Sequence, residues 1–156
     1  MADTNTSVSR RRFCAGACQA ASGATLATLF PACGGSPTSP SGMAATLGVM
    51  SGRFTGTGVQ VAVAGSALAD ASGAVLVEST AGVFLLARTS AGGFTAVDAI
   101  CSHESCTITG ADGATYVCPC HGSRYNRNGQ VMAGPAKASL RQFATTFTDG
   151  VVTIAV

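Results

Sequence analysis

The chain has 156 residues, of which 47% are hydrophobic and only 10% charged, with twenty glycines and no tryptophan. This composition excludes a disordered chain and leaves room for one small, loop-rich β domain plus a targeting segment. The net charge of +2 comes from three consecutive arginines near the N-terminus, because six basic and six acidic residues balance from Cys33 onward. A nearly neutral domain with few aromatic residues offers no basic stripe, so we expect no nucleic-acid partner.

The first 32 residues have the pattern of an export signal. Ser9, Arg10, Arg11 and Phe13 form an S-R-R-x-F core that resembles a twin-arginine signal. An apolar stretch without charged residues follows, and a basic region leading into an apolar region is typical of secretory signals. We therefore expect an exported bacterial protein at the periplasmic face of the cytoplasmic membrane.

The sequence leaves two alternatives for attachment to that membrane. FPAC, which ends at Cys33, resembles a bacterial lipobox, and Cys33 would then carry a lipid anchor. In the other alternative, residues 13–32 remain as a membrane-spanning helix, because about 20 apolar residues are long enough to cross a bilayer. Residues 33–52 are rich in Gly, Ser and Pro and are predicted to form a flexible tether. The folded domain is then predicted to span residues 53–156.

Short apolar segments alternate with glycine-rich turns from residue 53 onward. GVQVAVAGS places Val59, Val61 and Val63 on one face of a strand, and AVLVES and GVFLLART predict a hairpin around TAG. Asn128-Gly129 and Asp149-Gly150 are signals for two-residue hairpin turns. Sustained helical periodicity is absent after the signal, so we predict an all-β domain, an antiparallel sandwich or barrel.

Two loops, CSHESC at 101–106 and CPCHGS at 118–123, carry the residues capable of metal chemistry. Each loop offers one cysteine–histidine pair: Cys101 with His103, and Cys118 with His121. These are the only two histidines of the chain. Two thiolates and two imidazoles can together provide the four ligands of a metal site, and a structural zinc ion accepts the same ligand set.

Three features favour an iron–sulfur cluster over zinc. Cys106 and Cys120 remain beside the ligands, and a disulfide between them would join the two loops in a compartment where such bonds persist. Ser123 and Tyr125 follow closely enough to donate hydrogen bonds to sulfur, which raises the reduction potential of a cluster. Gly122 allows the backbone to approach the site without an intervening Cβ.

Together, C-x-H-x-x-C and C-P-C-H-G-S-x-Y, within residues 101–125, resemble the Rieske [2Fe–2S] proteins of the high-potential kind. The resemblance implies an antiparallel β fold with a cluster-binding loop subdomain and a [2Fe–2S] cofactor. It assigns Cys101 and Cys118 to one iron, and His103 and His121 to the other. Because two neutral imidazoles replace two anionic thiolates, such clusters reach about +300 mV, against about −400 mV for plant-type clusters.

The same resemblance extends to residues around the ligands. It implies a disulfide between Cys106 and Cys120, and a covering role for residues 134–136, which resemble the family's proline loop. Two positions depart from the usual pattern. Glu104 stands where quinol-oxidising complexes usually have an apolar leucine, and Asn126 stands where an aspartate is more usual. A charge at that position is costly to bury against an apolar quinone site.

The function implied by the resemblance is electron transfer. The first hypothesis is the iron–sulfur subunit of a membrane quinol-oxidising complex of the cytochrome bc type, with quinol and cytochrome b or c as partners. The alternative is a small Rieske subunit, or a lipoprotein electron carrier, of another periplasmic oxidoreductase such as the molybdenum enzyme arsenite oxidase. The sequence indicates no nucleophile or general base, so no catalytic residue is predicted and any catalysis belongs to the complex.

Overall fold

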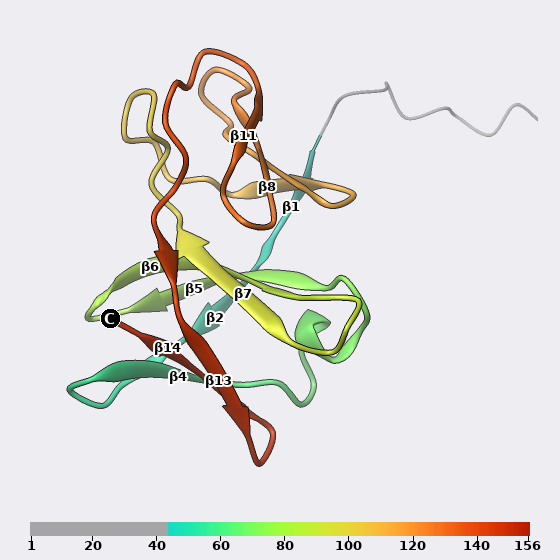
Figure 1. Cartoon of the computed structure of the whole chain (residues 1–156), viewed down its shortest axis with the longest axis vertical. Helices are drawn as coiled ribbons and strands as arrows, with labels where there is room; N and C mark the ends of the chain where they lie inside the picture. Colours follow the sequence, from blue (N-terminus) through green and yellow to red (C-terminus); the bar gives the residue numbers. More distant parts are fainter. Residues whose placement is uncertain (1–43) are drawn as a thin grey trace, which may run out of the picture. The chain divides into compact units, whose positions relative to one another are not determined.

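The computed structural model describes residues 44–156 (Figure 1). These residues form fourteen strands and one three-residue 3-10 helix, Ala67–Ala69, so the predicted all-β class is confirmed. Within the described part of the chain, no helix has the length and apolar character needed to cross a membrane. The predicted signal or anchor at 1–32, Cys33 and the tether up to residue 43 lie outside the described residues.

The strands form three sheets, which we call the loop sheet, the central sheet and the outer sheet. The loop sheet contains, in spatial order, β1 (Ala45–Thr46), β8 (Gly110–Asp112), β9 (Thr115–Val117), β10 (Arg124–Asn126) and β11 (Val131–Ala133). The central sheet contains β12 (Gln142–Phe143), β7 (Phe94–Asp98), β6 (Gly82–Arg88), β5 (Ala74–Ser79) and β2 (Gly48–Ser51). The outer sheet contains β13 (Thr145–Thr148), β14 (Val151–Ala155), β4 (Gly58–Ala62) and β3 (Arg53–Phe54).

The ordered β structure begins earlier than the sequence predicts. Residues 44–52 were expected to belong to the tether, but β1 pairs with β8 and β2 pairs with β5. The β2–β5 pair is parallel, whereas every other strand pair of the described residues is antiparallel. These strands show no alternation of buried apolar and exposed polar residues, and Val49 is exposed, so the sequence alone carries no strand signal there. Their partners, β8 and β5, lie far along the chain.

The predicted hairpins are present, with one difference in loop length. β5 and β6 pair in antiparallel register around the TAG turn. Asp149 and Gly150 have φ of +51° and +77° and join β13 to β14 in a two-residue turn, which agrees with a primed turn type. Asn128-Gly129 lies in a longer loop, since the Asn126 N–H donates to the Gln130 carbonyl at 2.9 Å. Gly129, with φ of +77°, occupies the left-handed position of this three-residue loop.

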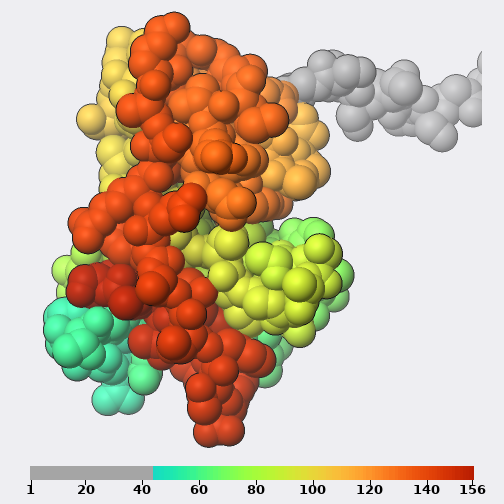
Figure 2. Space-filling model, in the orientation of Figure 1, coloured from blue at the N-terminus to red at the C-terminus, as the bar shows by residue number. Residues whose placement is uncertain are grey.

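The domain contains two separate groups of buried apolar side chains. One group lies between the central and outer sheets and includes Val59 and Val61 of β4 and Val63 directly after it, the three residues predicted to share one face. The other lies under the loop sheet and includes Cys101 and Cys118. Figures 1 and 2 show the corresponding division of the described residues: the yellow and orange loop region lies at one end, and green β4 and dark red β14 lie at the other.

Candidate metal centre

The first ligand loop, residues 101–106, follows β7 and turns back on itself through two backbone hydrogen bonds. The Cys101 N–H donates to the Cys106 carbonyl at 2.8 Å, and the Ser105 N–H donates to the Cys101 carbonyl at 2.9 Å. Ser105 has a φ of +57°, in the left-handed region. The turn places the Cys101 side chain inside the domain, where the residue is 2% exposed.

The second ligand loop, residues 118–123, joins β9 to β10 and repeats these two hydrogen bonds at the same spacing. The Cys118 N–H donates to the Ser123 carbonyl at 2.9 Å, and the Gly122 N–H donates to the Cys118 carbonyl at 3.0 Å. Gly122 has a φ of +69°, while a Cβ at this position would have no described atom within 4 Å. The left-handed backbone angle therefore favours glycine at this position.

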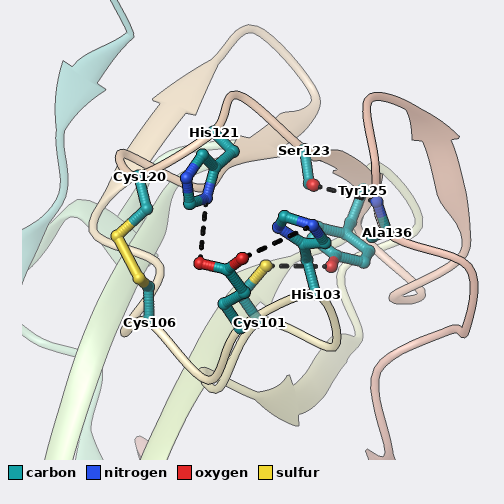
Figure 3. Close-up of polar contacts among 9 residues, drawn as sticks. Cys101, His103, Cys106, Cys120, His121, Ser123, Tyr125 and Ala136 are labelled. Carbon is teal, nitrogen blue, oxygen red and sulfur yellow. Dashed lines mark hydrogen bonds and ion pairs between the residues drawn. A yellow bond between two sulfur atoms is a disulfide. The ribbon is translucent and has the colours of Figure 1, made fainter.

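A disulfide between Cys106 and Cys120 joins the two loops, and this predicted bond is confirmed (Figure 3). Its sulfur atoms are 2.09 Å apart, and the two Cα atoms are 6.6 Å apart. The Cys118 Sγ lies within 4.8 Å of both disulfide sulfurs. Cys101 and Cys118 are the two free cysteines of the described residues, and both are buried.

A small hydrogen-bond network holds the Tyr125 hydroxyl against Cys101. The Tyr125 Oη is 3.3 Å from the Cys101 Sγ and accepts a hydrogen bond from the Ser102 N–H at 3.3 Å. It is also 3.1 Å from the Ser102 Oγ, which donates to the Ala138 carbonyl at 2.6 Å. A thiolate can only accept, so the Tyr125 O–H can serve as the donor to Cys101. Ser102 was not identified from the sequence, because a serine between two ligands gives no pattern of its own.

The two free thiols differ in their electrostatic surroundings. Burial raises the pKa of the Cys101 thiol, but hydrogen bonds from Tyr125 and from the backbone N–H groups of His103 and Glu104 bring the pKa below its ordinary value. Burial, together with the nearby Cys101, raises the pKa of Cys118. Because two adjacent thiolates repel each other, a bound cation is the natural partner of both.

Residues 134–136 pack directly against the second loop. Ser123 is fully buried, and its Oγ accepts a hydrogen bond from the Ala136 N–H at 3.2 Å (Figure 3). Because Ser123 is the acceptor in this bond, its hydroxyl proton remains available for donation to another group. Gly134 has a φ of +90°, and a Cβ there would lie 2.6 Å from the Ser123 Cα. The close approach of the two backbones therefore requires glycine at this position.

The two histidines lie side by side at the partly exposed edge of the site. Their ring centroids are 4.9 Å apart and the planes are nearly perpendicular, at 86°. The His103 Nδ1 is buried and has no hydrogen-bond partner among the described residues. A buried imidazole nitrogen without a partner is costly, and a metal ion bound to its lone pair removes that cost. Two buried thiols and two imidazoles, one with a free inner nitrogen, fit a mixed cysteine–histidine metal group.

Glu104 approaches both histidine rings. Its Oε2 is 3.6 Å from the His121 Nδ1, and its Oε1 is 4.0 Å from the His103 Nε2. The side chain is 60% exposed, so the carboxylate remains in contact with solvent. The sequence identified Glu104 as a departure from a known pattern, but it did not predict that the carboxylate would approach both rings.

The sequence profile of the Rieske [2Fe-2S] domain matches residues 57–144, which is more than half of the chain. This chain belongs to the Rieske [2Fe–2S] family. The cofactor of the family agrees with the donor set that the two loops bring together, and the zinc alternative is not supported by the match. The predicted Rieske-type β fold with a loop subdomain is likewise confirmed.

Curated relatives of this Rieske chain are cytochrome b6-f complex iron-sulfur subunits. The subunit of Chlorobaculum tepidum is 35% identical over 66 residues, a match that covers 42% of this chain and 36% of the relative. A subunit of Prochlorococcus marinus is 51% identical over 45 residues, covering 28% of this chain and 25% of the relative. The matches thus span only about a third of the relatives' length or less.

Solved structures support the same fold. A ferredoxin of Sphingomonas yanoikuyae B1 superimposes with a TM-score of 0.51 at 20% identity, covering 73% of this chain and 99% of that ferredoxin. The quaternary ammonium Rieske monooxygenase CntA superimposes with a TM-score of 0.53 at 17% identity, covering 64% of this chain and 31% of the enzyme. At these identities the likeness concerns the Rieske fold alone.

Proposed function

We propose that this chain transfers electrons through a high-potential [2Fe–2S] cluster, with Cys101 and Cys118 binding one iron and His103 and His121 binding the other. The observation that carries the proposal is the donor set: two buried thiols and two adjacent imidazoles lie on two loops that a disulfide holds together. The unpartnered, buried Nδ1 of His103 supports a ligand role for that ring.

The bound cluster would supply a one-electron redox centre, and the surrounding residues would set its potential and its access. The cysteines are buried at 2% exposure each, whereas the side chains of His103 and His121 are 27% and 48% exposed. The histidine edge is therefore the face through which an electron reaches a partner. Tyr125 and Ser123 are the potential-tuning residues of this proposal, because hydroxyl donors near sulfur favour the reduced, more negative state.

We propose further that the partner complex is a membrane quinol-oxidising complex of the cytochrome bc or b6-f type. The names of the curated relatives support this assignment, and partnership with cytochrome components follows from it. The S-R-R-x-F core and the apolar segment after it support export and retention at the periplasmic face of the membrane, through Cys33 or through residues 13–32.

Glu104 favours a second candidate function. A carboxylate at the histidine edge is poorly suited to an apolar quinone pocket, because burying the charge is costly. An electron carrier for another periplasmic oxidoreductase, such as a molybdenum enzyme, has no need to place this edge in such a pocket.

A redox experiment with the purified protein and its membranes separates the two candidates. We expect a midpoint potential well above zero, together with reduction of the cluster by quinol in membranes that contain the cytochrome complex. A strongly negative potential would contradict the high-potential assignment. A high potential with no quinol-dependent reduction, but with reduction by a periplasmic molybdenum enzyme, would favour the second candidate.

A further inference from the structure

Glu104 is the only carboxylate among the described residues that lies within 4.0 Å of a histidine nitrogen, and it approaches both histidines. The two rings each direct one nitrogen toward it, at 4.0 Å for His103 and 3.6 Å for His121. For His103, the nitrogen facing Glu104 is Nε2, and the opposite Nδ1 is the buried atom without a hydrogen-bond partner. On His103, Nδ1 is thus free for a metal while Nε2 faces the carboxylate. On His121, the nitrogen that faces Glu104 is Nδ1.

We propose that the Glu104 carboxylate, which lies within 4.0 Å of a ring nitrogen of each proposed ligand histidine, lowers the reduction potential of the cluster. The inference rests on the proposed function and concerns the same site. At 3.6 and 4.0 Å these contacts are longer than hydrogen bonds, so Glu104 acts on the rings through its charge. A negative charge beside a metal-bound imidazole makes the ring a stronger donor to the metal, which stabilises the oxidised, more positive state.

The charge acts in the same direction. A negative charge close to the cluster disfavours the addition of an electron, whereas the hydroxyl of Tyr125 near Cys101 favours it. The Tyr125 hydroxyl contacts the Cys101 sulfur, whereas the Glu104 carboxylate contacts the histidine rings. We therefore infer that the potential reflects a balance between Tyr125, which raises it, and Glu104, which lowers it.

No other carboxylate of the described residues lies within 4.0 Å of a histidine nitrogen. Asp112, the carboxylate of the remaining ion pair, is engaged by Arg124 at 2.9 Å. Glu78 lies on β5 in the central sheet and is exposed, so it provides a matched control that removes the same charge from a different part of the domain.

The test compares four proteins that each carry the cluster: the parent, Glu104→Gln, Glu104→Leu and Glu78→Gln. Each protein is held at the midpoint potential of the parent and at one fixed, neutral pH. Electron paramagnetic resonance then measures the ratio of reduced to oxidised cluster. Removing one partly solvated unit charge several ångströms from the cluster should change the ratio of reduced to oxidised cluster by about 3- to 10-fold. We expect that change, toward the reduced state, in both Glu104 variants and not in Glu78→Gln.

Salt provides a second readout that a purely structural role would not give. Because the Glu104 side chain is 60% exposed, added salt screens its charge, and the difference between parent and Glu104→Gln should shrink as ionic strength rises. If the parent shows the mixed cysteine–histidine signal but Glu104→Gln has the same ratio of reduced to oxidised cluster as the parent, the inference about Glu104 is overturned and the proposed function stands. An equal change in Glu78→Gln would also overturn it. A parent without that signal would overturn both the inference and the proposed function.

Discussion

Tyr125 and Tyr116 are both fully buried, but their hydroxyl groups meet different surroundings. The Tyr125 hydroxyl lies within hydrogen-bond distance of Cys101 and Ser102. The Tyr116 hydroxyl has no hydrogen-bond partner among the described residues, and the Arg127 guanidinium lies 4.4 Å from the centre of its ring. The two tyrosines therefore allow the effect of a hydrogen bond near the cluster to be separated from the effect of removing a buried hydroxyl.

We predict that Tyr125→Phe lowers the midpoint potential by roughly 30–100 mV, because the reduced cluster loses a hydrogen bond to the Cys101 sulfur. Potentiometric titration of the purified protein measures the change. Tyr116→Phe is the control and should leave the potential within about 10 mV of the parent, since its hydroxyl donates to no sulfur. Equal shifts in both variants would show that burial, and not the hydrogen bond, determines the effect.

Gly134 allows residues 134–136 to approach the second ligand loop closely. We predict that Gly134→Ala lowers the free energy of unfolding by about 2–4 kcal/mol, since the added Cβ would overlap backbone atoms and the left-handed φ of +90° disfavours alanine. Chemical denaturation measures the loss.

Gly113→Ala is the matched control for this substitution. Gly113 also has a positive φ, of +54°, but a Cβ there would have no described atom within 4 Å. Gly113→Ala should therefore lower the free energy of unfolding by only about 1–2 kcal/mol, which is the contribution of the backbone angle. If both variants lose the same free energy, close backbone contact is not the reason for glycine at 134.

At the level of elements, the two ligand loops share one backbone hydrogen-bond pattern, and the disulfide links them across a sequence separation of 14. The pattern places a buried cysteine at the start of each loop, but the histidines occupy different steps: His103 is two residues after its cysteine and His121 is three residues after. The disulfide closes this asymmetric pair of loops, so we expect it to support the site without contributing a ligand.

We predict that the double variant Cys106→Ser/Cys120→Ser keeps all four proposed ligands but loses its cluster faster than the parent. Its free energy of unfolding should fall by about 3 kcal/mol, the value expected for a bridge that closes a loop of this length. Both cysteines are replaced because a single substitution leaves a thiol within 4.8 Å of the Cys118 sulfur. Cluster loss is followed by visible absorbance under mild denaturant, and a rate equal to that of the parent would contradict the supporting role.

Sequence reasoning worked best where local chemistry determines structure. Asp149 and Gly150 form the expected turn because both positions need a positive φ, and the spacing of cysteines and histidines identified both loops. It failed for β1 and β2, which are two and four residues long and pair with partners far along the chain. It also missed Ser102 and the placement of Glu104, because both depend on how two loops pack in three dimensions.

At the scale of the whole domain, the group of buried residues between the central and outer sheets contains none of the proposed ligands. The other buried group, to which the loop sheet and the central sheet both contribute, contains both ligand cysteines. The outer sheet should therefore contribute stability, while the loop region sets the redox properties.

We predict that Ile154→Ala, on β14, lowers the free energy of unfolding by about 2–5 kcal/mol because it leaves a cavity at a fully buried position. The midpoint potential of the folded variant should equal that of the parent. Denaturation and potentiometric titration of the same preparation test both parts, and a clear shift in potential would show that the outer sheet and the site are coupled.

The central claim, a [2Fe–2S] cluster held by two cysteines and two histidines, is tested most directly by electron paramagnetic resonance of the reduced protein together with its metal and sulfide content. The account predicts two iron atoms and two acid-labile sulfides per chain. It also predicts the rhombic signal with a low average g value that mixed cysteine–histidine ligation produces. A colourless protein that contains one zinc ion per chain and no acid-labile sulfide would contradict it.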